Sequence, residues 1–316
     1  MFQIFDVVSD PSLSAERVAS LRALMARQKL DGYIVPRTDE HQGEYIPADA
    51  ERLSWLTGFS GSAGTAIITG QNAALFVDGR YTVQARAEVD ETVIDVVAMA
   101  TQKAEDWLFE TLPEGARVGF DPKLFTLAQV ERLQVRLGGK DILLKPVRKN
   151  LVDALWGKDR PPPPSGAIVA HALQYSGQPS AEKLSAMMED LRSEGHDGVV
   201  LTSRESIAWL TNLRGSDVAH TPVFSAYAIV HQRAKPELFV HTGKLTAEAR
   251  AAIKGVFKVA AYDKFWERLK ALKEAGKTVR IDAGTASYEV ARHLGGAKRI
   301  VRGADPCVAP RAIKNA

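Results

Sequence analysis

The sequence repeats itself once, and this repeat limits the folds open to the chain more than any other feature. Each half contains an amphipathic helix, an Asp-Gly step into an apolar strand, a Trp-Leu-Thr phrase and a strand that ends in aspartate. The paired landmarks are Asp31 and Asp197, Trp55 and Trp209, and Asp121 and Asp282. Their offsets are 166, 154 and 161 residues, so connection lengths differ while the order holds. Because two copies are too few for a solenoid, the repeat predicts a duplicated α/β domain.

Each copy is predicted to be a mixed β-sheet with helices packed on it. Apolar residues at helical spacing mark the first helix of each copy; they are Val18, Leu21, Leu24 and Met25, then Leu184, Met187, Met188 and Leu191. Ser180 stands where the N-cap of the second helix belongs. Trp55 and Trp209 hold equivalent places in the repeat, so both are predicted to belong to the core.

A proline run separates the two copies. Arg160 is followed by Pro161, Pro162, Pro163 and Pro164, and four consecutive prolines fit neither a helix nor a central strand. They favour a semi-rigid polyproline II spacer. Two domains, residues 1–160 and 161–316, are therefore expected, which suits a chain of 316 residues.

Composition excludes several classes of protein. The 41 basic and 38 acidic side chains leave a net charge of +3, and the absence of a Lys/Arg block argues against nucleic-acid binding. The single cysteine, Cys307, rules out an intrachain disulfide and argues against a cysteine-ligated zinc site. No apolar run reaches the roughly 18 residues that span a bilayer, and residues 1–6 lack the features of a secretory signal. A cytoplasmic protein is expected.

The common catalytic motifs are missing. The glycines of Gly58–Gly64 follow G-x-x-G-x-x-G rather than the dinucleotide-binding G-x-G-x-x-G spacing. Neither Ser60 nor Ser62 lies in a nucleophile elbow, and no P-loop occurs. The seven histidines form no H-E-x-x-H pair. The chain alone is therefore predicted to be a scaffold or binding unit that holds no metal or cofactor of its own.

Several phrases nevertheless match one family in order. They are Asp39–Ile46, Gly58–Ile68, Asp78–Ala85, Asn150–Trp156, Ile207–Val218 and Ala312–Asn315. Together they resemble the three-domain Xaa-Pro aminopeptidases (aminopeptidase P) of the creatinase/prolidase group, over nearly the whole chain. The resemblance implies two creatinase-type N-terminal domains, followed after residue 316 by a "pita-bread" catalytic domain.

That resemblance also implies the chemistry of the whole enzyme. The third domain would hold two metal ions, usually manganese, through two Asp, one His and two Glu. The substrates would be short peptides with proline at position two, a bond that ordinary aminopeptidases handle poorly because proline has no amide hydrogen and constrains the residue before it. The N-terminal domains would wall the cleft and help to build a homodimer, and this chain alone would be inactive.

Four residues are candidates for contact with substrate. The resemblance implies that Arg80 binds it, since a guanidinium suits oxygen-rich partners; alternatively Arg80 is a surface side chain paired with Asp78. His41 either hydrogen-bonds within a loop or touches substrate. Asp217 and His220 either line the cleft from the second domain or belong to a stabilising loop network.

Two other functions remain open. One is a peptide- or protein-binding module that never had a catalytic domain. The other is a prolidase or creatinase, although the long duplicated N-terminal half argues against it because those enzymes usually carry a single such domain. The reading frame beyond Ala316 distinguishes these alternatives.

Overall fold

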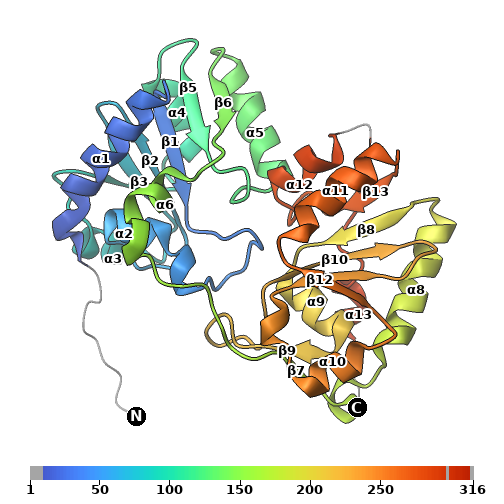
Figure 1. Cartoon of the computed structure of the whole chain (residues 1–316). Coiled ribbons are helices and arrows are strands. Elements are labelled where there is room, and N and C mark those ends of the chain that lie inside the picture. The colour runs from blue at the N-terminus through green and yellow to red at the C-terminus, as the bar shows by residue number, and fades with distance from the viewer. Residues whose placement is uncertain (1–9, 297–298, 314–316) are drawn as a thin grey trace, which may run out of the picture. The chain divides into compact units, whose positions relative to one another are not determined.

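The computed structural model describes residues 10–296 and 299–313, which group into two compact units (Figure 1). Unit 1 comprises residues up to Thr38, Ala48–Phe125 and Gln129–Pro162; unit 2 comprises Asp39–Pro47, Thr126–Ala128 and the chain from Pro163. Two short segments from the first half of the sequence therefore belong to unit 2. Lys314 and Asn315 of the last family phrase, and residues 1–6, lie outside the described residues.

Unit 1 is built on a six-stranded sheet with the order β4-β3-β2-β1-β5-β6. Its strands are β1 (Gly32–Pro36), β2 (Gly64–Thr69), β3 (Ala73–Val77), β4 (Asp95–Ala98), β5 (Arg117–Phe120) and β6 (Leu143–Pro146). Its helices are α1 (Ser14–Arg27), α2 (Arg52–Thr57), α3 (Thr82–Glu88), α4 (Ala104–Thr111), α5 (Leu127–Gly138) and α6 (Leu151–Trp156). Short 3-10 turns lie at Pro11–Leu13, Ala48–Ala50 and Gly157–Asp159.

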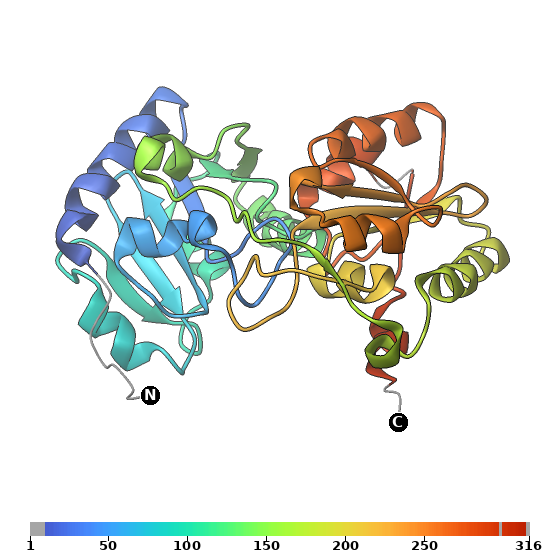
Figure 2. The same ribbon diagram turned by 60° about the horizontal axis from the view of Figure 1, so that its bottom comes forward.

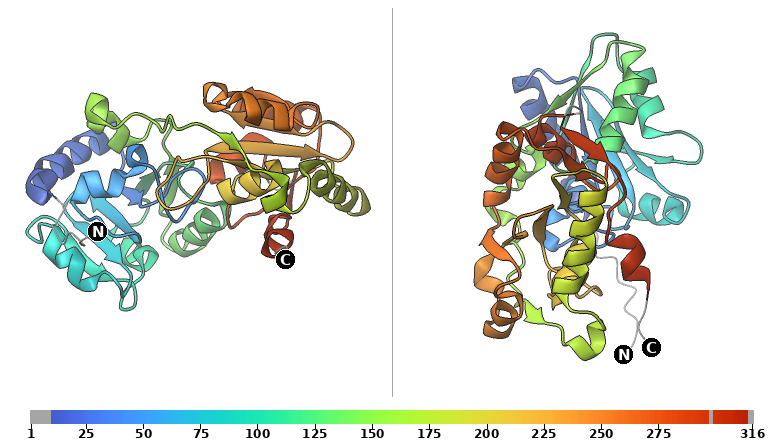
Figure 3. Two further views of the ribbon diagram at one scale, coloured as in Figure 1. Left: turned by 90° about the horizontal axis from the view of Figure 1, so that it is seen from below. Right: turned by 90° about the vertical axis from the view of Figure 1, so that its right-hand side faces the viewer.

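Successive side chains along the strands of unit 1 point to opposite faces of the sheet, and both faces are apolar. Tyr33 and Val35 of β1 join α1, α2 and α6 in one buried cluster, which includes Val18, Leu21 and Met25 as the helical spacing predicts. The opposite face carries Phe76, whose ring meets Trp107 of α4 at 5.9 Å between centroids. Helices thus cover both faces of the sheet, as Figures 2 and 3 show.

Unit 2 repeats this design with the strand order β12-β11-β10-β8-β13-β14. Its strands are β8 (Gly198–Leu201), β10 (Ala226–His231), β11 (Glu237–Val240), β12 (Lys258–Ala261), β13 (Val279–Ile281) and β14 (Ile300–Arg302), with the pair β7 (Val169–Ala170) and β9 (Leu213–Arg214) apart from the sheet. Its helices are α7 (Leu173–Ser176), α8 (Ser180–Ser193), α9 (Arg204–Thr211), α10 (Ala247–Ile253), α11 (Lys264–Glu274), α12 (Tyr288–Leu294) and α13 (Val308–Ala312), with a 3-10 turn at Thr242–Lys244.

The core of unit 2 also has two sides. Helices α8, α9 and α10 pack on one face of the sheet, where Leu184, Met187 and Leu191 are buried, and α11 and α12 pack on the other. The prediction that Ser180 caps α8 is wrong, because Ser180 is already helical and Pro179 holds the cap position without a side-chain hydrogen bond. Trp209 is partly buried against this core, and Trp55 is partly buried against that of unit 1.

The two sheets have the same topology, which confirms the predicted duplication. If the six strands of each sheet are numbered along the chain, both sheets have the spatial order 4-3-2-1-5-6. In both, the first strand pairs antiparallel with the second and parallel with the fifth. The two Asp-Gly landmarks also act alike: the Asp31 carboxylate accepts the Arg117 N–H at 2.7 Å, and the Asp197 carboxylate accepts the Thr278 N–H at 2.9 Å.

One connection differs strongly between the copies. Residues 37–51 separate β1 from α2, whereas only Thr202 and Ser203 separate β8 from α9. The longer connection explains why the landmark offset falls from 166 residues at Asp31 to 154 at Trp55. It also contains Asp39–Pro47, the segment that belongs to unit 2.

Candidate functional site

Arg80 lies on the turn that follows β3. The Asp78 carboxylate closes this turn by accepting the Arg80 backbone N–H at 2.9 Å, and it receives the Arg80 Nη2 at 2.6 Å. The Arg80 side chain is 64% exposed, and its guanidinium lies 5.2 Å from the centroid of the Tyr81 ring. These contacts hold the Asp78 pKa below its usual value, first through the side-chain hydrogen bond from Arg80. The turn therefore presents the Arg80 guanidinium to solvent while the partly exposed Asp78 carboxylate holds it.

His41 is buried in unit 2, within the Asp39–Pro47 segment. Its Nδ1 lies 2.9 Å from the Thr202 carbonyl oxygen and its Nε2 lies 2.8 Å from the Tyr262 hydroxyl, so both ring nitrogens have partners. Burial, and then the charge of Arg204, lowers the pKa of His41. The lowered pKa favours the neutral form of the imidazole near pH 7.

Two charges anchor the same segment. The buried Asp39 carboxylate forms an ion pair with Arg204 of α9, and its other oxygen accepts the His41 N–H at 2.9 Å. The Tyr262 hydroxyl donates to Glu40, and burial followed by the Glu40 charge raises the pKa of Tyr262. Segment 39–47 is thus fixed in unit 2 by charge-assisted hydrogen bonds.

Asp217 and His220 occupy different environments in the β9–β10 connection. The buried Asp217 carboxylate forms an ion pair with Lys244 and accepts the Ser225 N–H at 2.8 Å, so it ties its loop to the 3-10 turn at Thr242–Lys244. His220 is exposed, with a φ of +60°, and its ring meets Tyr45 at 5.9 Å. Within the described part of unit 2, neither of these side chains shares a hydrogen bond or ion pair with His41.

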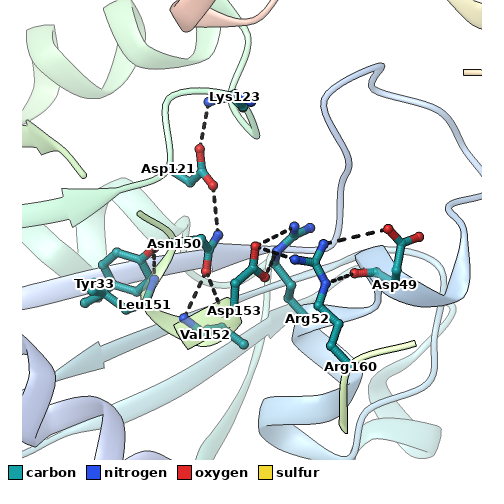
Figure 4. Close-up of polar contacts among 10 residues, drawn as sticks. All are labelled: Tyr33, Asp49, Arg52, Asp121, Lys123, Asn150, Leu151, Val152, Asp153 and Arg160. Carbon is teal, nitrogen blue, oxygen red and sulfur yellow. Dashed lines mark hydrogen bonds and ion pairs between the residues drawn. The ribbon is translucent and has the colours of Figure 1, made fainter. Parts of the chain in front are cut away.

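A polar cluster in unit 1 explains the Asn150–Trp156 phrase (Figure 4). The Asn150 side chain accepts the Val152 N–H at 2.9 Å, which caps α6, and donates to Asp121 at 2.9 Å. Burial raises the Asp121 pKa. The amide therefore joins the end of β5 to the start of α6, a role that the sequence did not suggest.

Arginines from two distant segments complete this cluster. Arg52 of α2 forms a forked pair with Asp153 at 2.6 and 3.0 Å. Arg160 reaches the same carboxylate at 2.8 Å and donates to the Asp49 carbonyl oxygen at 2.7 Å (Figure 4). The start of the proline run is therefore fastened to unit 1, and Asp153 is occupied by two cations rather than open to a ligand.

The described residues contain no group of three or more His, Cys, Asp or Glu side chains placed to hold a metal ion. In the same part of the chain, no helix has both the length and the apolar character needed to cross a membrane.

Family comparisons account for both units. A family model described as the Creatinase/Prolidase N-terminal domain matches residues 159–316, and a second model with the same description matches residues 17–154. The chain belongs to the Creatinase/Prolidase N-terminal domain family. This confirms the predicted resemblance and the predicted fold of two tandem creatinase-type domains.

Relatives of these creatinase-type domains are Xaa-Pro aminopeptidases. The chain is 38% identical over 311 residues to a probable Xaa-Pro aminopeptidase P of Aspergillus niger, a match that covers 96% of this chain and 50% of the relative. A probable Xaa-Pro aminopeptidase P of Aspergillus fumigatus is 37% identical, with 96% and 47% covered. The chain thus spans about half the length of the curated relatives that it matches.

A solved structure supports the same family. The X-prolyl aminopeptidase of Caenorhabditis elegans, described as a cytosolic enzyme with a di-nuclear active site, matches with a TM-score of 0.89 and 27% identity. The match covers 96% of this chain and 52% of that protein. The creatinase-type fold therefore extends over nearly all of the present sequence.

Proposed function

We propose that this chain forms the N-terminal, non-catalytic domains of a metal-dependent aminopeptidase that releases the first residue of Xaa-Pro peptides. One observation carries the proposal: two tandem creatinase-type domains fill this chain, yet they match only about half of each Xaa-Pro aminopeptidase. The absence of a metal-ligand group among the described residues is compatible with a division in which another part of the protein performs the chemistry.

The finer features of the whole enzyme form part of the proposal. Its substrates are short peptides with proline at position two, and its active site holds two metal ions, which we take to be manganese. The protein works in the cytoplasm as a homodimer, and the present domains shape the substrate cleft. The cytosolic, di-nuclear relative from Caenorhabditis elegans supports the location and the number of metal ions.

A direct experiment compares this chain with the full product of its own reading frame. Both proteins are incubated with manganese and an Arg-Pro-Pro peptide, and release of the first residue is measured. We expect release by the longer protein, abolished by a chelator, and none by residues 1–316. Chelator-sensitive release by residues 1–316 alone would overturn the division of labour. A reading frame that lacks the two Asp, one His and two Glu ligands would instead favour the stand-alone binding module.

Within this proposal Arg80 is the strongest candidate for contact with substrate. Its side chain is 64% exposed and sits on a tight turn, so it projects beyond the sheet. Its pair with Asp78 is exposed, and exposed pairs contribute only about 0–1 kcal/mol. A substrate carboxylate or carbonyl can therefore compete for the guanidinium fork at little cost to stability. His41, Asp217 and His220 remain weaker candidates, and the two buried side chains must first lose their present partners.

Steady-state kinetics on the longer protein test the role of Arg80. Arg80→Ala is expected to lower kcat/KM roughly ten- to a hundredfold, which corresponds to about 1.5–3 kcal/mol of charge-assisted hydrogen bonding. Arg80→Lys recovers part of the loss, because an ammonium lacks the planar fork. Arg86→Ala is the matched control, since Arg86 is 57% exposed and paired with Glu91 on the same part of unit 1. Equal activity in Arg80→Ala and Arg86→Ala would refute the role.

A further inference from the structure

Lys183 is a buried cation that has no anionic partner among residues 10–296 and 299–313. It lies on α8, is 4% exposed, and its Nζ donates to the Trp209 carbonyl oxygen at 2.8 Å and to the Asn212 side-chain oxygen at 2.7 Å. The same ammonium stands 4.3 Å from the centroid of the Trp209 ring. All three contacts are to neutral groups, and burial lowers the pKa of Lys183 to about 8.

Two more basic side chains gather beside it. Arg214 of β9 pairs with Val169 of β7 in a short antiparallel ladder. The His171 N–H donates to the Asn212 carbonyl oxygen at 2.8 Å, which extends this β7–β9 ladder by one residue pair. This register makes Arg214 and His171 diagonal neighbours across the ribbon. Burial, then the charges of Arg214 and Lys183, lowers the pKa of His171, so the three groups lie within electrostatic reach of one another.

The carboxyl end of α9 neutralises only part of this positive charge. Arg214 Nη1 donates to the Ala208 carbonyl oxygen at 2.9 Å and Lys183 to that of Trp209, so both cations cap the carboxyl end of one helix. A helix end carries about half a negative charge, whereas the two side chains together bring two positive charges. Capping therefore leaves most of the positive charge unbalanced.

In the part of the chain that the structure describes, no carboxylate supplies the missing negative charge. Among the described residues, Lys183, Arg214 and His171 form no ion pair with Asp or Glu. The buried Cys307 thiol interacts electrostatically with Lys183, but burial raises the pKa of Cys307 far above neutrality, so the thiol stays protonated. Arg214 also keeps its Nε and Nη2 without a described hydrogen-bond partner while it caps α9 through Nη1.

We propose that Lys183, Arg214 and His171 form an oxyanion-binding site at the carboxyl end of α9 (Figure 1), which takes a small ligand carrying a phosphate or carboxylate group. Arg214 offers its free guanidinium edge to two oxygens of the ligand. Lys183 supplies a positive charge that its hydrogen bonds hold in place, and His171 supplies a ring nitrogen from the neighbouring strand. The site is independent of the aminopeptidase proposal.

Isothermal titration calorimetry on the 316-residue chain tests the site, with inorganic phosphate and succinate as separate probes against chloride at equal ionic strength. We expect one saturable site for at least one probe, and the probe that binds identifies the ligand class. Arg214→Gln and Lys183→Met should each weaken binding about tenfold or more, the loss expected for a hydrogen bond to a charged group. The control is Lys264→Met, which removes an exposed lysine of the same unit.

The outcomes separate a built site from general attraction to a basic surface. Retained binding in Lys264→Met and loss in the other two variants supports the site. Failure of both anions to saturate overturns it, as does an equal loss in Lys264→Met. If Lys183→Met does not fold, Arg214→Gln decides alone, since Lys183 still caps α9 in that variant; unchanged affinity in Arg214→Gln then overturns the proposal.

Discussion

Removing the Asp39 carboxylate should destabilise unit 2 far more than an ordinary loop substitution. Asp39 pairs with Arg204, which is 3% exposed and whose Nη1 already lacks a hydrogen-bond partner among the described residues. In Asp39→Ala the guanidinium would keep only the Ser225 hydroxyl, at 3.1 Å. Breaking a buried pair from one side costs about 3–5 kcal/mol. For a domain of about 150 residues this lowers Tm by roughly 6–20 °C.

The assay must report on each unit separately, because one free energy of unfolding does not describe two domains. Hydrogen exchange measured by mass spectrometry in increasing urea does so, through peptides from β8 in unit 2 and β1 in unit 1. We expect Asp39→Ala to lower the midpoint for β8. The double variant Asp39→Ala/Arg204→Met should regain part of the loss, because it leaves no buried charge.

Glu91→Ala is the control, since it breaks the exposed pair with Arg86, which is worth less than about 1 kcal/mol. A β8 midpoint in Asp39→Ala that matches the Glu91→Ala protein would refute the reasoning. It would mean that the Asp39–Arg204 ion pair contributes little to the stability of unit 2.

Three further predictions concern the same segment. Folding lowers the pKa of His41, so as the pH falls the unfolded chain binds a proton at this residue before the folded chain does. The free energy of unfolding of unit 2 should therefore decrease below about pH 6.5, by up to about 1.4 kcal/mol per pH unit. His41→Gln should remove this pH dependence in urea titrations. Gly43→Ala places a Cβ 2.9 Å from both Arg204 Nη1 and the Tyr45 carbonyl oxygen and should cost about 1–3 kcal/mol, whereas Gly79→Ala meets nothing within 4 Å and should be near neutral; equal melting temperatures would contradict this. A fragment of residues 163–316 lacks the whole segment, so the backbone amides of its β8 should exchange faster than in the full chain. Adding a synthetic peptide of residues 37–49 should slow this exchange. Identical exchange in the fragment and the full chain would contradict the assignment of this segment to unit 2.

The duplicated architecture could be predicted because its signals are local. Apolar spacing in α1 and α8 depends on residues close in sequence, and the Asp-Gly step into the first strand recurs as a repeated pattern. The error at Ser180 is a shift of one residue at a helix end, where a serine suits the cap position and the first turn alike.

The partners of the candidate site residues could not be predicted. His41 meets Tyr262 across 221 positions and Asp39 meets Arg204 across 165, and nothing in a loop phrase indicates which domain it packs against. Lys183 is a polar residue of an amphipathic helix, so the sequence alone indicates no special role for it. Only the fold shows that the Lys183 side chain reaches the carboxyl end of α9, where Arg214 of β9 also donates.

The placement of Asp39–Pro47 in unit 2 has a consequence for synthesis on the ribosome. This segment emerges early, but Arg204 and Tyr262 follow it by 165 and 221 residues. At roughly 5–20 residues per second, the nascent chain waits on the order of 10–40 s before those partners exist. During that interval Asp39, His41 and Ile46, all buried in the finished protein, are open to chaperones and proteases. Slow codons between the proline run and Tyr262 would lengthen this exposure, so translation speed in that stretch should affect the yield of folded protein.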